Sequence, residues 1–96
     1  MIYVDRLANY PVNQVQLSAR KYGNTWCHIW TDGPVEELVA FAQAIGLKEQ
    51  WLQDSETHSI AHFDLLPSKR KRAIKNGAVE MSYRDYLQKL RNKEKV

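Results

Sequence analysis

The chain has 96 residues, of which 44% are hydrophobic and 26% are charged, and these are the proportions of an ordinary globular protein. A chain of this length forms one domain with one modest core. The single cysteine excludes an internal disulfide and a zinc site made of several cysteines. No apolar run approaches the roughly 20 residues of a membrane span, and the first residues lack a signal-peptide core, so we expect a cytoplasmic protein without membrane contact.

The charge is divided unevenly along the chain, although the formal net charge is only +3. Residues 1–68 carry four Lys/Arg against eight Asp/Glu, whereas residues 69–96 carry ten against three. A basic second part predicts a polyanionic partner. A solvated helix face followed by a basic tail explains the same charges, and both interpretations stay open.

Two strands are predicted in the first third of the chain. The β-branched and aromatic residues at 1–5 predict the first strand, and those at 26–30 predict the second. Alternation within the second strand places His28 on the same face as its two tryptophans. Residues 7–25 match neither the strand period nor the helix period and are expected to form a long loop, with one edge strand in it as the open alternative.

The middle of the chain predicts a helix that returns to the sheet. Apolar residues recur at three- and four-residue spacing over residues 34–45, which predicts a helix that Gly46 ends in a left-handed conformation. Residues 51–53 follow at the usual distance for a third short strand. Residues 54–61 are predicted to be a polar loop.

The last third of the chain predicts two helices around one strand. A helix is expected over residues 67–76 and a fourth strand at 78–81, and Ser82 begins a capping-box-like sequence before the last helix. Alternating strands and helices indicate an α/β fold. We expect a small, partly parallel sheet of about four short strands with three helices, in a single domain over residues 1–92. Residues 93–96 are expected to be a frayed basic tail.

Polar residues follow the predicted strands, where ligands bind in parallel α/β sheets. Asp5 ends the first strand, Asp32 begins the first helix, and Ser68 and Lys69 begin the second helix. The amides of a helix N-terminus also favour anions. We therefore expect these side chains to line one ligand-binding pocket.

Histidine is scarce and lies near carboxylates in the sequence. His28 and His62 are the candidate catalytic residues together with Asp64, because a carboxylate can orient an imidazole that acts as general acid or base. The same groups can bind a divalent cation, which is the second interpretation and leaves the cofactor undecided. Lys69 and Arg70 are the candidates for holding a phosphate.

Structural roles explain the same residues. His28 between two tryptophans fits a packed histidine, Asp32 fits a helix cap, and Asp64 fits a cap or an ion-pair partner of the second helix. His58 and His62 have the spacing of a metal-binding pair on a helix, but the segment that contains them does not have a helical pattern.

Several short motifs occur in a fixed order along the chain. They are Tyr3-Val4-Asp5, Trp26-x-His28-x-x-x-Asp32, Glu37-Leu38-x-x-Phe41-Ala42-x-x-Ile45-Gly46-Leu47, His62-Phe63-Asp64-x-x-x-Ser68-Lys69-Arg70 and Ala73-Ile74-x-x-Gly77-Ala78. This order resembles the small family labelled domain of unknown function 4031, which is found in bacteria and frequently in bacteriophages. The resemblance spans nearly the whole chain apart from residues 7–24 and the basic tail.

The resemblance implies a set of pattern residues but no settled activity. The residues of this chain that match the family pattern are Asp5, His28, Asp32, His62, Asp64 and Lys69. Many relatives have a second aspartate where this chain has Arg6, which weakens any metal scheme that needs two adjacent carboxylates. The bacteriophage association implies an accessory role during infection, in the host cytoplasm, including inhibition of a host enzyme or defence protein.

Two functions follow from these observations. The first is a His/Asp/Lys pocket that binds a phosphate-bearing ligand, either a nucleotide or a nucleic acid. Whether the protein also hydrolyses this ligand is left open. The second is a non-catalytic interaction protein that binds a host protein or nucleic acid through its basic residues and the loop at 7–25. The sequence leaves the oligomeric state and the choice between these functions open.

Overall fold

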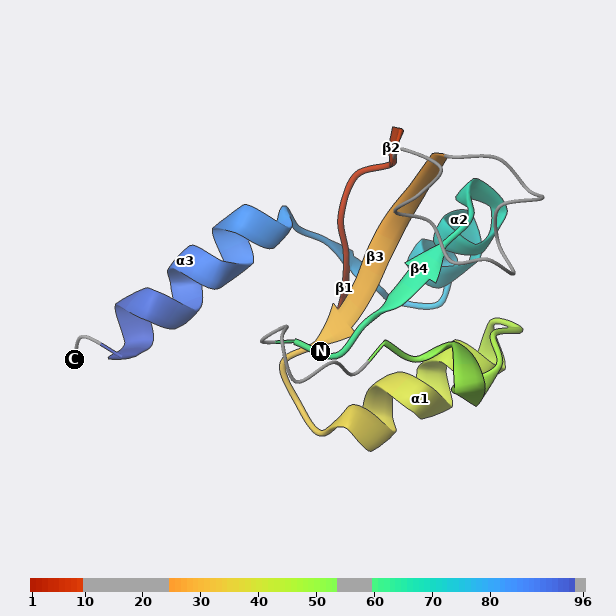
Figure 1. Cartoon of the computed structure of the whole chain (residues 1–96), viewed down its shortest axis with the longest axis horizontal. Coiled ribbons are helices and arrows are strands. Elements are labelled where there is room, and N and C mark those ends of the chain that lie inside the picture. Colours follow the sequence, from red (N-terminus) through yellow and green to blue (C-terminus); the bar gives the residue numbers. More distant parts are fainter. Residues whose placement is uncertain (10–24, 54–59, 95–96) are drawn as a thin grey trace.

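The computed structural model describes residues 1–9, 25–53 and 60–94 (Figure 1). The described strands are β1 (Ile2–Val4), β2 (Ala8–Asn9), β3 (Thr25–Thr31), β4 (Phe63–Leu65) and β5 (Val79–Glu80), which form one five-stranded sheet. The helices are α1 (Val35–Ala44), α2 (Pro67–Lys75) and α3 (Tyr83–Glu94), with a 3-10 turn, η3 (Glu49–Trp51), after α1. This architecture is the single α/β domain that the alternation of strands and helices predicts.

β3 lies at the centre of a mixed sheet. β1 and β4 both pair with β3 in antiparallel orientation, and β5 pairs with β1 in parallel orientation. β2 also pairs with β3, but its register is displaced from that of β1. Val4 and Ala8 are four positions apart in the sequence, whereas their partners on β3, Ile29 and Trp26, are three positions apart. The chain between β1 and β2 therefore contains an extra residue, as in a β-bulge.

Two expectations for secondary structure are corrected. β4 lies in a segment without a predicted strand. β2 is an edge strand, which agrees with the alternative left open for the loop at 7–25, of which residues 10–24 are outside the described part. The strand expected at 51–53 is replaced by η3 and a single bridge between Gln53 and His62. The physical reason is that the amide of Leu52 closes the 3-10 turn on the carbonyl of Glu49 instead of pairing in the sheet.

Alternation along the strands divides the buried side chains between two faces of the sheet. On one face the sheet packs against α1 and α2, through Ile2, Val4, Cys27, Ile29, Leu38, Ala42, Ile45, Leu47, Phe63, Leu65, Ala73 and Ala78. On the other face Tyr3 and Trp30 are covered by Tyr86 of α3. Cys27 is fully buried, and burial raises the pKa of its thiol to about 12, so the thiol is protonated at neutral pH.

α3 extends from the remainder of the chain at one end of the long axis (Figure 1). The chain measures 45 × 27 × 23 Å along its principal axes. α3 contacts the sheet through its apolar stripe, where Tyr86 lies against Tyr3 and Trp30. Among the described helices, none combines the length and the apolar composition that crossing a membrane requires.

The basic start of α2 stabilises the end of α1. Nζ of Lys69 donates a 3.0 Å hydrogen bond to the carbonyl oxygen of Ile45, and Arg72 donates to the same oxygen at 3.4 Å. α1 has no basic residue in its own last turn. These two cations therefore supply the positive charge that the C-terminus of a helix favours.

Substitution of Gly46 tests this contact. Gly46 follows α1 with φ +94° and Gly77 follows α2 with φ +106°, so alanine at either position is expected to lower the free energy of unfolding by about 1–2 kcal/mol. A Cβ at Gly46 would lie 2.5 Å from Nζ of Lys69, whereas nothing lies within 4 Å of a Cβ at Gly77. Urea unfolding should show the larger loss for Gly46→Ala. An equal or smaller loss than that of Gly77→Ala would contradict a stabilising role for Lys69.

Candidate metal centre

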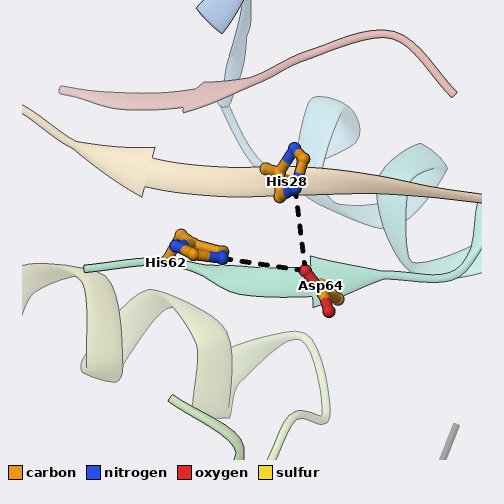
Figure 2. Close-up of side chains that lie close together, drawn as sticks. All are labelled: His28, His62 and Asp64. Carbon is orange, nitrogen blue, oxygen red and sulfur yellow. Dashed lines mark ion pairs between the residues drawn. The ribbon is translucent and has the colours of Figure 1, made fainter. Parts of the chain in front are cut away.

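Three neighbouring strands place four of the predicted site residues together. His28 on β3 lies opposite Asp64 on β4 in the antiparallel register. Asp5 follows β1, and its amide donates a 3.2 Å hydrogen bond to the carbonyl of His28. His62 precedes Asp64 by two residues, which is the spacing of side chains on one face of a strand. Figure 2 shows His28, His62 and Asp64 converging between β3 and β4.

Both imidazoles direct the same nitrogen to one carboxylate oxygen. Nε2 of His28 and Nε2 of His62 each lie 3.9 Å from Oδ1 of Asp64. One ligand atom from each of the three residues lies within 4.8 Å of the other two. A cation with ligand bonds of about 2.0–2.2 Å would require these atoms to lie closer together than they do here.

Outer hydrogen bonds orient the two imidazoles. Nδ1 of His28 lies 2.8 Å from Oδ2 of Asp5, and Nδ1 of His62 lies 3.1 Å from the carbonyl oxygen of Ile60. A carboxylate and a carbonyl only accept, so we assign the proton to Nδ1 in both rings. Nε2 is then the nitrogen of each ring that can bind a cation. This is the arrangement of histidine ligands in metal sites.

The carboxylates are held in the same way. Oδ1 of Asp5 accepts a 2.6 Å hydrogen bond from the amide of His28, so Asp5 contacts both the backbone and the ring of that residue. The hydrogen bond to Asp5 raises the pKa of His28 against the opposing effect of burial. Nε2 of Gln53 donates a 2.7 Å hydrogen bond to Oδ2 of Asp64. Oδ1 of Asp64 therefore remains directed to the two imidazoles.

Arg70 supports this group from the side of α2. Its Nε donates a 2.8 Å hydrogen bond to the carbonyl oxygen of Asp5, and its Nη2 forms an ion pair of 3.2 Å with Glu80 on β5. The guanidinium thus connects the end of β1 to β5. Arg70 positions Asp5 and is engaged by these contacts, whereas the sequence suggested that it holds a phosphate.

The ligand candidates are partly accessible. The exposed fraction of the side chain is 29% for His28, 16% for His62 and 15% for Asp64. Groups of this burial keep a solvent-facing side while most of their hydration is replaced by protein contacts. A cation bound here would therefore have access to water or to a small ligand.

The structure does not bring Asp32 to this group. The carboxylate of Asp32 accepts a hydrogen bond of 3.1 Å from the hydroxyl of Tyr3 and forms a 2.8 Å ion pair with the amino group of Met1. Convergence of the strand ends was expected on the assumption of parallel strands. Because β1 and β3 are antiparallel, the end of β3 meets the start of β1, and Asp32 and Asp5 lie at opposite ends of the pair.

The residues expected to bind phosphate at the start of α2 are also placed differently. Lys69 reaches the end of α1, and Ser68 is exposed in the first turn of α2. Asp64 does not cap α2, which has no side-chain cap, and it accepts from Gln53 instead. His58 lies outside the described residues. Lys69 and Arg70 both contact other parts of the protein, and their role as a phosphate clamp stays a prediction.

Two residues beside the centre were not predicted to belong to it. Gln53 was assigned to a strand, and no sequence signal shows that its amide reaches Asp64. Tyr83 was assigned to the buried stripe of the last helix, yet its ring centroid lies 6.2 Å from that of His28. The position of α3 beside the centre depends on the strand order, which the sequence alone does not reveal.

A family model described as "Protein of unknown function (DUF4031)" matches residues 11–93. The chain belongs to this family. The match confirms the resemblance inferred from the order of the motifs, and the matched range of DUF4031 includes His28, His62 and Asp64, whereas Asp5 precedes it. No curated protein and no solved structure matches the chain.

Proposed function

We propose that the protein binds one divalent transition-metal ion through Nε2 of His28, Nε2 of His62 and Oδ1 of Asp64, and that the bound ion activates water for hydrolysis. The proposal is carried by the convergence of these three atoms, with both Nδ1 atoms engaged by outer acceptors. Two imidazoles and one carboxylate are a ligand set suited to zinc or ferrous iron. A set of three protein ligands leaves a coordination position for water.

The residues around the three ligands have supporting roles in this proposal. Asp5 holds the tautomer of His28 and increases the basicity of its Nε2, and Gln53 directs Asp64. A divalent cation lowers the pKa of a bound water to near 7, so hydroxide is accessible at neutral pH without a separate nucleophilic side chain. This agrees with the protonated state of the buried Cys27 thiol.

A phosphate ester is the substrate class that we propose. Lys69 and Arg70 each donate to a carbonyl oxygen of the protein, so in this proposal the metal ion itself provides the positive charge that contacts the phosphate. The formal net charge of +3 favours an anionic substrate over a cationic one. A bacterial or bacteriophage accessory role remains part of this proposal, since an activity of this kind would act on host or phage nucleotides.

Hydrolysis of bis(p-nitrophenyl) phosphate tests the proposal. The protein loaded with zinc, manganese or cobalt should release nitrophenolate, and both chelator and His62→Ala should abolish the release. Lys71→Gln, an exposed change outside the centre, should keep it. Equal turnover by the His62→Ala protein would contradict the proposal. Binding of metal without hydrolysis of this ester or of p-nitrophenyl acetate would refute the catalytic part and favour the non-catalytic alternative.

A further inference from the structure

α3 provides a basic surface that begins at the candidate metal centre. Its first residue, Tyr83, lies beside His28, and the helix then extends outward (Figure 1). Residues 83–92 include three basic side chains and one acidic side chain, all exposed, namely Arg84, Lys89, Arg91 and Asp85. The described side chains of α3 therefore carry a net positive charge, although α2 carries more, and α3 is the helix that projects from the remainder of the molecule (Figure 1).

Two arginines form a stripe along α3. Arg84 and Arg91 are seven residues apart, which is two helical turns, so both lie on the same side of the helix about 10 Å apart. The buried Tyr86 and half-buried Leu90 lie on a different side and face the sheet and the end of β3. One guanidinium group can donate two hydrogen bonds to the oxygens of one phosphate, so two arginines in a row are suited to binding successive phosphates of a polyanion.

An aromatic side chain, Tyr83, lies at the N-terminal end of α3, next to Arg84. Tyr83 is partly exposed, and its ring also contacts Trp30 edge to face at 5.2 Å. Proteins that bind single-stranded nucleic acid typically combine a row of basic side chains, which contact the phosphates, with aromatic side chains on which the bases stack. A flexible single strand can also bend from α3 to the centre, which costs a stiff duplex deformation energy.

We propose that α3 binds single-stranded nucleic acid and guides its phosphodiester backbone to the metal centre. This inference rests on the proposed function, because it specifies the phosphate ester on which that centre acts. Arg84 and Arg91 contact phosphates, and Tyr83 stacks on a base next to the metal ligands. Duplex nucleic acid is expected to bind more weakly.

Fluorescence anisotropy with a fluorescein-labelled oligothymidylate tests the inference. Arg84→Gln/Arg91→Gln is expected to weaken binding about tenfold at low salt and to reduce the slope of log K against log salt by about 1.4, since each lost single-strand contact removes about 0.7. Lys71→Gln/Lys75→Gln on α2 is the matched control. It removes the same charge from exposed positions and should change the affinity less than about twofold.

Each outcome separates the two proposals. An equal loss in the α2 control, equal affinity for the corresponding duplex, or no binding by the wild-type protein at low salt would overturn the role of α3. His62→Ala should bind the oligonucleotide as the wild-type protein does but should bind zinc at least about a hundredfold less tightly. Loss of zinc binding in Arg84→Gln/Arg91→Gln would also contradict the inference, because these residues are not ligands. Failure of the wild-type protein to bind zinc would refute the proposed function itself.

Discussion

Zinc at a hundredfold excess over its dissociation constant for the wild-type protein is expected to stabilise that protein by about 2.7 kcal/mol and His62→Ala by no more than about 0.4 kcal/mol. For a domain of this size, each kcal/mol corresponds to about 4–8 °C in the melting temperature, so the wild-type shift should be about 10–20 °C. The variant loses one of three ligand atoms, and the remaining two hold zinc at least about a hundredfold less tightly, since losing an outer hydrogen bond alone costs 10–100-fold. Differential scanning fluorimetry measures the shift.

Two aspartate variants provide the matched comparison. Asp64→Asn should lose the zinc-dependent shift, because an amide is a poor ligand in place of the carboxylate. Asp32→Asn should keep it, because Asp32 contacts Met1 and Tyr3 at the far end of the β1–β3 pair. Asp5→Asn should show a zinc-dependent shift between those of Asp64→Asn and Asp32→Asn, because its affinity for zinc is expected to be about 10–100-fold lower than that of the wild-type protein. A full shift in His62→Ala, or its loss in Asp32→Asn, would contradict the assignment of the ligands.

Replacing Phe63 with alanine is expected to lower the free energy of unfolding by about 3–5 kcal/mol. The ring is fully buried in the core between the sheet and α1 and α2. A domain of 96 residues has a total stability of about 5–14 kcal/mol, so this loss is about a fifth of it or more. Urea unfolding followed by tryptophan fluorescence measures the change.

The large loss expected for Phe63→Ala follows from the alternation of side chains between the two faces of β4. Phe63 points into the core, whereas the residues on either side of it, His62 and Asp64, point to the metal centre. Phe41→Ala is the matched control, because Phe41 is only partly buried against the same core. The loss should be clearly smaller there. A loss for Phe63→Ala no greater than that for Phe41→Ala would contradict the placement of β4.

Features with local causes were predictable from the sequence. The apolar spacing and Gly46 predicted α1, and Pro67 and Gly77 correctly placed the ends of α2. β4 was missed because a strand of three residues next to a polar segment is too short to show its alternation. The antiparallel pairing of β1 with β3 depends on contacts between distant residues, which no local pattern encodes.

The candidate centre was predictable by residue type but not by partner. Scarcity and proximity to carboxylates singled out His28 and His62, and the strand ends singled out Asp5. The grouping of these residues with Asp32 and Lys69 depended on an assumed parallel sheet and does not hold in the structure. The acceptor for Nδ1 of His62 is a backbone carbonyl, and such an atom is present at every residue, so the sequence gives no indication of it.

The most direct measurement is anomalous X-ray scattering at the zinc absorption edge from crystals grown with zinc. The account predicts one peak about 2.0–2.2 Å from Nε2 of His28, Nε2 of His62 and Oδ1 of Asp64, while Nδ1 of His28 stays hydrogen-bonded to Asp5. Zinc bound elsewhere, with no peak between these three atoms, would contradict it.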